Sequence, residues 1–116
     1  MKNSPVFVWQ ERVLRKINPG DIYCLETDRN YTRFHLRGPD RVMVRCTLDS
    51  ALEMLPEDEF VKTHRSYAVS INFIEHISRE YVRISGQDVP LSRRYYKPLL
   101  EKLAIIGSRT SSAKDE

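Results

Sequence analysis

The sequence of 116 residues is poor in the residue types that build metal sites, disulfide scaffolds and phosphate loops. Its two cysteines, Cys24 and Cys46, lie in strand-like apolar runs, so we expect buried, reduced thiols that hold no metal. The three histidines show no metal-ligand spacing, and the four glycines are isolated. His64 and Ser66 are neighbours, but no orienting acid can be assembled with them. These absences argue against an enzyme and against a cofactor.

The sequence also lacks a long apolar run. No segment approaches the ~20 apolar residues of a membrane-spanning helix, and the N-terminal apolar stretch is too short for a signal peptide. We therefore expect a cytoplasmic domain without membrane contact. A chain of this length predicts one domain, which we assign to residues 1–106. Residues 107–116 are small and polar, and we expect them to form a disordered C-terminal tail.

The formal net charge is only +3, although 30% of the residues are charged, a little above the usual share. Its distribution is uneven. Residues 28–45 carry five arginines against two aspartates, residues 47–60 carry five acids and no base, and residues 62–97 carry seven basic residues against three acids. Two basic segments that flank an acidic one predict a positive face on the molecule. Ordinary solvated strand faces explain the same pattern equally well.

Hydrophobic periodicity predicts short strands for most of the chain. Apolar residues alternate with polar ones in 31–37 and 41–46, as in strands that are buried on one face. After Thr47 the period becomes helical and continues to Pro56, and the acidic composition of this helix argues that it points away from any DNA. A second helix is predicted from Ser92 to Ile106, interrupted or kinked at Pro98. Further strand-like runs lie at 6–9, 12–17, 21–27, 73–77, 81–85 and 89–91. The sequence thus predicts a mainly β fold with about eight strands and two short helices.

Two short segments combine basic and aromatic side chains. The first is F-V-K-T-H-R-S-Y (60–67), which we interpret as leading into a loop over residues 64–72. The second is S-R-R-Y-Y-K (92–97), at the start of the second predicted helix. Arginine at a helix start is slightly disfavoured by the helix dipole unless an anion is near. Basic and aromatic groups on loops suit contacts to phosphates and base edges, so both segments favour DNA binding.

These same segments carry a family resemblance. The pattern F-V-K-T-H-R-S-Y-A-V-S-I-N-F-I-E-H-I (60–77), followed by V-P-L-S-R-R-Y-Y-K-P-L-L-E-K-L (89–103), closely resembles the LytTR family of bacterial DNA-binding domains. The upstream D-I-Y-C-L-E-T-D-R-N-Y-T (21–32) resembles the strand and loop that precede these motifs in the family. The resemblance covers residues 5–104.

The resemblance implies an elongated, mainly β fold of short antiparallel sheets with two short helices. It implies a transcription regulator that inserts loops into successive major grooves of double-stranded DNA at paired promoter repeats, with a second copy on the adjacent repeat. Arg65 and Arg94 match positions that read bases or grip phosphates in the family. The full set of DNA-contacting residues implied by position is Arg29, Asn30, Tyr31, Thr32, Arg33, His64, Arg65, Arg93, Arg94, Tyr95 and Lys97.

The sequence departs from the family in one respect. Most members act in two-component systems as the output domain of a response regulator and carry an N-terminal receiver domain, which this sequence lacks. We therefore expect either an excised fragment or a stand-alone regulator. The alternative function is a protein-interaction module that keeps the fold without binding DNA, which the weak net charge also allows.

Overall fold

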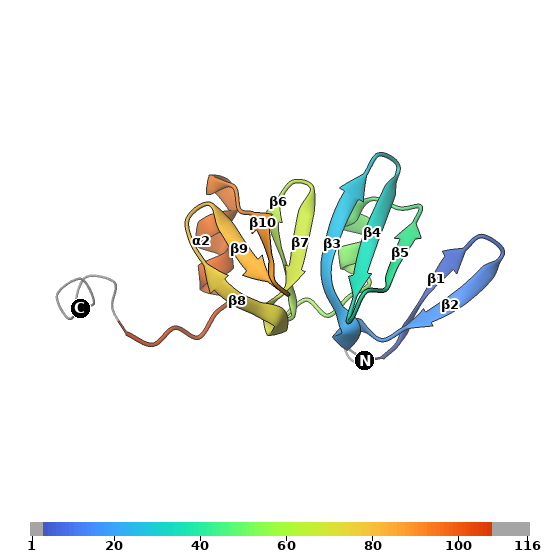
Figure 1. Ribbon diagram of the computed structural model, residues 1–116, viewed down its shortest axis with the longest axis horizontal. Helices are drawn as coiled ribbons and strands as arrows, with labels where there is room; N and C mark the ends of the chain where they lie inside the picture. The colour runs from blue at the N-terminus through green and yellow to red at the C-terminus, as the bar shows by residue number, and fades with distance from the viewer. Residues whose placement is uncertain (1–3, 108–116) are drawn as a thin grey trace.

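The computed structural model describes residues 4–107, and its secondary structure is mainly β. Ten strands within this range form three antiparallel sheets that lie in a row, so the molecule is elongated (Figure 1). This confirms the predicted fold class. None of the helices in residues 4–107 is long and apolar enough to cross a membrane. The expected tail falls outside the described residues except for Gly107.

The sheets follow one another along the chain. The first is a hairpin of β1 (Val6–Gln10) and β2 (Val13–Ile17). The central sheet has the order β5-β4-β3-β7-β6 and the third has the order β10-β9-β8. Their strands are β3 (Ile22–Asp28), β4 (Tyr31–Leu36), β5 (Arg41–Val44), β6 (Phe60–His64), β7 (Tyr67–Ser70), β8 (Ile74–Ile77), β9 (Tyr81–Ile84) and β10 (Gln87–Pro90). Helix α1 (Leu48–Glu53) precedes β6, helix α2 (Arg93–Glu101) follows β10, and single 3-10 turns occupy Pro19–Asp21 and Ile71–Phe73.

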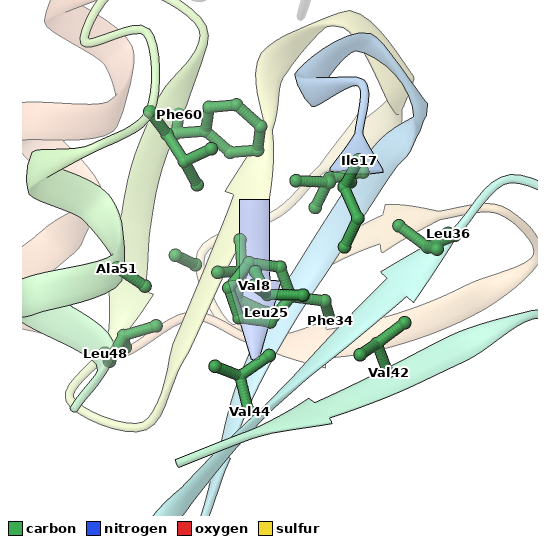
Figure 2. Packing of buried hydrophobic residues seen from close by; sticks show 13 residues of the cluster. Val8, Ile17, Leu25, Phe34, Leu36, Val42, Val44, Leu48, Ala51 and Phe60 are labelled. Atoms are coloured by element: carbon green, nitrogen blue, oxygen red, sulfur yellow. The ribbon is translucent and has the colours of Figure 1, made fainter. Parts of the chain in front are cut away.

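Strands β3, β6 and β7 of the central sheet are buried on both faces, whereas β4 and β5 are buried on one face only. Successive residues of a strand point to opposite faces, so Leu25 of β3 packs in one core whereas Cys24 packs in the other. In Figure 2 the first core gathers side chains of the β1–β2 hairpin, the central strands and α1. The second core lies between the central sheet, the third sheet and α2. Burial on both faces explains why β3 begins with four consecutive buried residues.

Most predicted elements are confirmed. Thr32, Phe34 and Leu36 are the buried face of β4, as their alternation predicts. Thr47 caps α1, because its hydroxyl accepts a hydrogen bond from the Ser50 amide at 3.1 Å. The apolar stripe of α1 packs into the first core.

Two predictions of secondary structure were wrong. Residues 64–72 do not form a loop: β6 and β7 are the two strands that the sequence analysis missed, and only Arg65 and Ser66 lie between them. Ala68, Val69 and Ser70 are buried, so small residues there serve close packing rather than exposure. The second helix is also shorter than predicted, since it begins at Arg93, accommodates Pro98 and ends at Glu101.

The two cysteines differ in environment. Both are free thiols, and Cys24 is buried as predicted whereas Cys46 is only half-buried. Burial, with Glu26 nearby, raises the pKa of Cys24 to about 12. Since the thiolate is the reactive form, we expect iodoacetamide at pH 8 to modify Cys46 in the folded protein and to leave Cys24 intact. Peptide mapping by mass spectrometry checks this, with protein in urea as the control in which both react. Rapid modification of Cys24 under native conditions would contradict it.

Candidate nucleic-acid interface

The β3–β4 turn presents the first group of predicted contact residues. Arg29 and Asn30 are its two exposed tip residues, and Tyr31 beside them is 39% exposed. Arg29 has a φ of +60°, in the left-handed region that costs a non-glycine residue about 1 kcal/mol. Glu11 and Ser85 have φ values of +60° and +48° in the β1–β2 and β9–β10 turns, so the positive φ of Arg29 belongs to the geometry of a tight hairpin turn, which holds this side chain at the exposed tip.

The β6–β7 turn presents Arg65. The Ser66 amide donates to Nδ1 of His64 at 3.0 Å, and the Thr27 amide of β3 donates to the Ser66 carbonyl at 2.9 Å. The His64 ring also stands edge-on to Tyr67, with 5.7 Å between ring centroids. Burial, together with Glu26, raises the pKa of Tyr67, so this phenol stays neutral. His64 therefore shapes the turn, and exposed Arg65 is its projecting side chain.

The start of α2 presents Arg93, Arg94 and Lys97, all exposed. The Ser92 amide donates to the Thr63 carbonyl of β6 at 2.8 Å, which fixes the start of the helix beside the β6–β7 hairpin. The guanidinium of Arg94 lies 5.4 Å from the centre of the Tyr95 ring. Tyr95 is half-buried, so it orients Arg94 through a cation–π contact more than it offers its own surface.

Two of the predicted residues are engaged within the protein. Thr32 is fully buried, and its hydroxyl donates to the Cys46 carbonyl at 2.9 Å. Arg33 is paired with Asp28 at 2.7 Å and with Glu26 at 3.4 Å. Thr32 thus has no surface to offer, and the charge of Arg33 is already balanced.

The arginine run of residues 28–45 is divided between the two ends of the central sheet. Arg29 and Arg45 lie at one end, because β4 and β5 are antiparallel and pair Thr32 with Val44. Arg37 lies at the other end, where it is bonded to Asp21 at 3.3 Å and stacked 5.1 Å from the Phe73 ring centre. The run therefore supplies two separate groups of cations.

The structure brings in two cations, Arg45 and Lys62, that the predicted set omitted. One open hollow of about 540 Å³ is lined by these two residues together with Arg29 and Arg65. The sequence contained a signal for both missing residues, since Arg45 closes the arginine run and Lys62 belongs to the 60–67 segment. The sequence did not show the strand pairing of the central sheet, which places the end of β5 beside the β3–β4 and β6–β7 turns. We refer to this site as the basic hollow.

Lys62 connects the basic hollow to α2. Its ammonium lies 5.7 Å from the centre of the Tyr95 ring, and the guanidinium of Arg94 on α2 contacts the same ring. The same ammonium pairs with Asp49 of α1 at 3.0 Å. An acidic residue of α1 therefore lies in the hollow, against the expectation that this helix points away from the basic surface.

The two turns and the start of α2 lie along one side of the molecule, the upper side in Figure 1. The β1–β2 hairpin extends away from them at one end. No group of three or more His, Cys, Asp or Glu residues that could hold a metal ion occurs within residues 4–107. The arrangement is a row of exposed cations on rigid turns, which suits recognition of a polyanion.

Comparison with known proteins adds a family. The family model of the LytTr DNA-binding domain matches residues 12–104. The Sensory transduction protein LytT of Enterococcus faecalis (strain ATCC 700802 / V583) is 27% identical in an alignment of 112 residues that covers 90% of this chain and 45% of that protein. The chain thus spans about half the length of this curated relative. A solved LytTr DNA-binding domain from Bacillus cereus superimposes with a TM-score of 0.75 at 21% identity, covering 88% of this chain and 98% of that one.

Proposed function

The chain belongs to the LytTr DNA-binding domain family, which is a family of DNA-binding domains rather than enzymes, and from this premise we propose how it binds DNA. It recognises double-stranded promoter DNA by sequence, as the DNA-binding part of a bacterial transcription regulator in the cytoplasm. The observation that carries the proposal is that backbone hydrogen bonds hold three basic segments on one side of the molecule: Thr27 to Ser66 links the two turns, and Ser92 to Thr63 links α2 to β6.

The side chains divide into two roles. Arg65 and Arg94 are exposed on fixed elements, and a guanidinium can donate two parallel hydrogen bonds to O6 and N7 of a guanine in the major groove. Arg29, Asn30, Arg93 and Lys97 are exposed beside them and suit phosphate contacts, which set the register without reading sequence. His64, Tyr95 and Arg33 support these residues from within, and Tyr31 lies at the edge of the surface.

The proposed target is a pair of repeats, with one copy of the domain on each. A single domain presents a short row of cations, so its affinity for one repeat is modest. Two domains on adjacent repeats gain affinity because the second contact is made at a high local concentration. A signalling partner such as the receiver of a two-component system would act by bringing two copies together.

Selection from a randomised double-stranded DNA pool tests this function. We expect enrichment of a short motif, and we expect log K for that motif to fall with log salt at a slope of about −3 or steeper, because each neutralised phosphate contributes about −0.9. Fluorescence anisotropy over 50–300 mM KCl measures the slope, with a scrambled duplex as control. An affinity that is independent of salt would refute DNA binding.

One observation favours the alternative function, a protein-interaction module. Phe7 and Trp9 on the β1–β2 hairpin are 58% and 61% exposed, and exposed aromatic residues are common at protein interfaces. If the domain binds no DNA at low salt while the hairpin residues mediate association with a partner, the alternative replaces the DNA-binding function.

A further inference from the structure

The basic hollow carries more charge than its surroundings balance. It is lined by Arg29 of the β3–β4 turn, Arg45 beyond β5, Lys62 of β6 and Arg65 of the β6–β7 turn, and the acid among its lining residues is Asp49. Within residues 4–107, Arg29, Arg45 and Arg65 make no ion pair. Three arginines from three segments thus line the hollow without an ion-pair partner of their own.

An anion would relieve this accumulation of like charge. A phosphodiester group has two free oxygens that accept the paired hydrogen bonds of a guanidinium, and the open volume of about 540 Å³ admits it from solvent. The hollow lies between the β3–β4 and β6–β7 turns, because Thr27, Arg29 and Arg65 all contribute to its wall. Because the hollow lies between the two turns, we expect the backbone of DNA that engages both turns to lie near it.

Lys62 is the one cation of the hollow that already has an acidic partner. Its side chain is 25% exposed and meets Asp49 at 3.0 Å, whereas the Asp49 side chain is 75% exposed. Such an ion pair at the surface is weak, so a phosphate can displace the carboxylate. The carboxylate also repels an approaching phosphate, which means that Asp49 competes with DNA for Lys62.

We propose that the basic hollow is a site for a single phosphate of the DNA backbone, held by Arg45 and Lys62 together with the two turns, and that Asp49 weakens this site by competing for Lys62. This inference rests on the proposed DNA-binding function and extends it. Arg45 and Lys62 are then positioning residues that act on every DNA sequence alike. Asp49 lowers affinity for all DNA and leaves the preferred motif unchanged.

Two variants with matched controls test the site on the enriched motif. Asp49→Asn should raise affinity about two- to fivefold at low salt and steepen the salt slope by up to about one. Asp88→Asn is its control, because Asp88 is also exposed and paired with an arginine, Arg83 at 3.3 Å, in the third sheet. Arg45→Ala should weaken binding to all duplexes about three- to tenfold and flatten the slope by about one.

Arg41→Ala is the control for Arg45→Ala. Arg41 is exposed at the opposite end of β5 and does not line the basic hollow, so its loss removes the same charge from elsewhere. Duplexes with a neutral methylphosphonate at each backbone position locate the phosphate. A methylphosphonate at one backbone position should weaken DNA binding by the natural protein and should not change DNA binding by the Arg45→Ala variant.

The outcomes separate this inference from the function on which it rests. If the natural protein binds its motif but Arg45→Ala behaves like Arg41→Ala and Asp49→Asn behaves like Asp88→Asn, the phosphate site is refuted and sequence-specific binding stands. If the natural protein selects no motif and shows no salt-sensitive binding, the function itself fails. A rise in affinity with Asp49→Asn, together with one methylphosphonate position silenced by Arg45→Ala, establishes the site.

Discussion

Replacing Arg65 with alanine should weaken binding to the preferred motif by about 1–3 kcal/mol, a factor of roughly 5 to 150, and should relax the sequence preference at one position of the site. Arg65 is exposed at the tip of the β6–β7 turn and makes no ion pair within residues 4–107. The turn is held by the hydrogen bonds of Ser66 to His64 and to Thr27. The proposed groove contact of Arg65 would therefore start from a fixed base, and its loss should remove contacts without disturbing the turn.

Binding of the variant to the selected motif and to single-base variants of it measures the effect. Arg12→Ala is a matched control, because Arg12 is an exposed arginine in the two-residue turn of the β1–β2 hairpin. This hairpin and α2 lie at opposite ends of the molecule (Figure 1). We expect little change from Arg12→Ala. An equal loss of affinity for motif and scrambled DNA with Arg65→Ala would show a phosphate contact instead of a base contact.

Replacing Leu99 with alanine should lower the free energy of unfolding by about 2–5 kcal/mol, a large fraction of the stability of a small domain. Leu99 is fully buried in the second core, with Val82, Ile84 and Val89. It is the buried residue of α2, so the cavity left by truncation lies under the helix that carries Arg94. The surrounding strands are fixed by hydrogen bonds and cannot collapse fully into this space.

Urea unfolding followed by far-ultraviolet circular dichroism measures the loss. Leu100→Ala serves as the control, because Leu100 is only half-buried on the same helix and should lose much less. We also expect the folded fraction of the Leu99→Ala protein to bind its motif more weakly, since α2 no longer holds Arg93 and Arg94 firmly. A change in stability no larger than that of Leu100→Ala would show that α2 is not anchored by this residue.

Much of the fold could be predicted from local patterns. The alternation in 31–37 and the stripe after Thr47 depend on periods that a strand and a helix impose on any chain, and both are confirmed. The β6–β7 hairpin escaped the same reasoning. Its residues alternate between two cores instead of between a core and solvent, so Val61 and Ala68 are both buried although they face different partners. Polar neighbours such as Lys62 and His64 made the segment look like a loop.

The candidate site was also predictable only in part from local pattern. Exposed arginines at 65 and 94 are evident in short basic segments of the sequence. The alternation in 31–37 already places Thr32 on the buried face of β4, but local pattern did not show that Arg33 is balanced by Asp28 and Glu26. Arg33 and Arg29 look equivalent in a run of arginines. The backbone of the β3–β4 turn places Arg29 on the surface, whereas Arg33 forms an ion pair with Asp28.

The sequence by itself determined that this protein is a mainly β domain with basic segments of the LytTR type, because strand periods, turn residues and the 60–77 and 89–103 motifs are local features. The tertiary structure alone decided which cations gather. Arg29, Arg45, Lys62 and Arg65 are brought together by antiparallel pairing of strands across the central sheet. Asp49 reaches the same place because α1 packs on that sheet. Electrostatic energy depends on distance in space, and pairing between remote strands sets that distance.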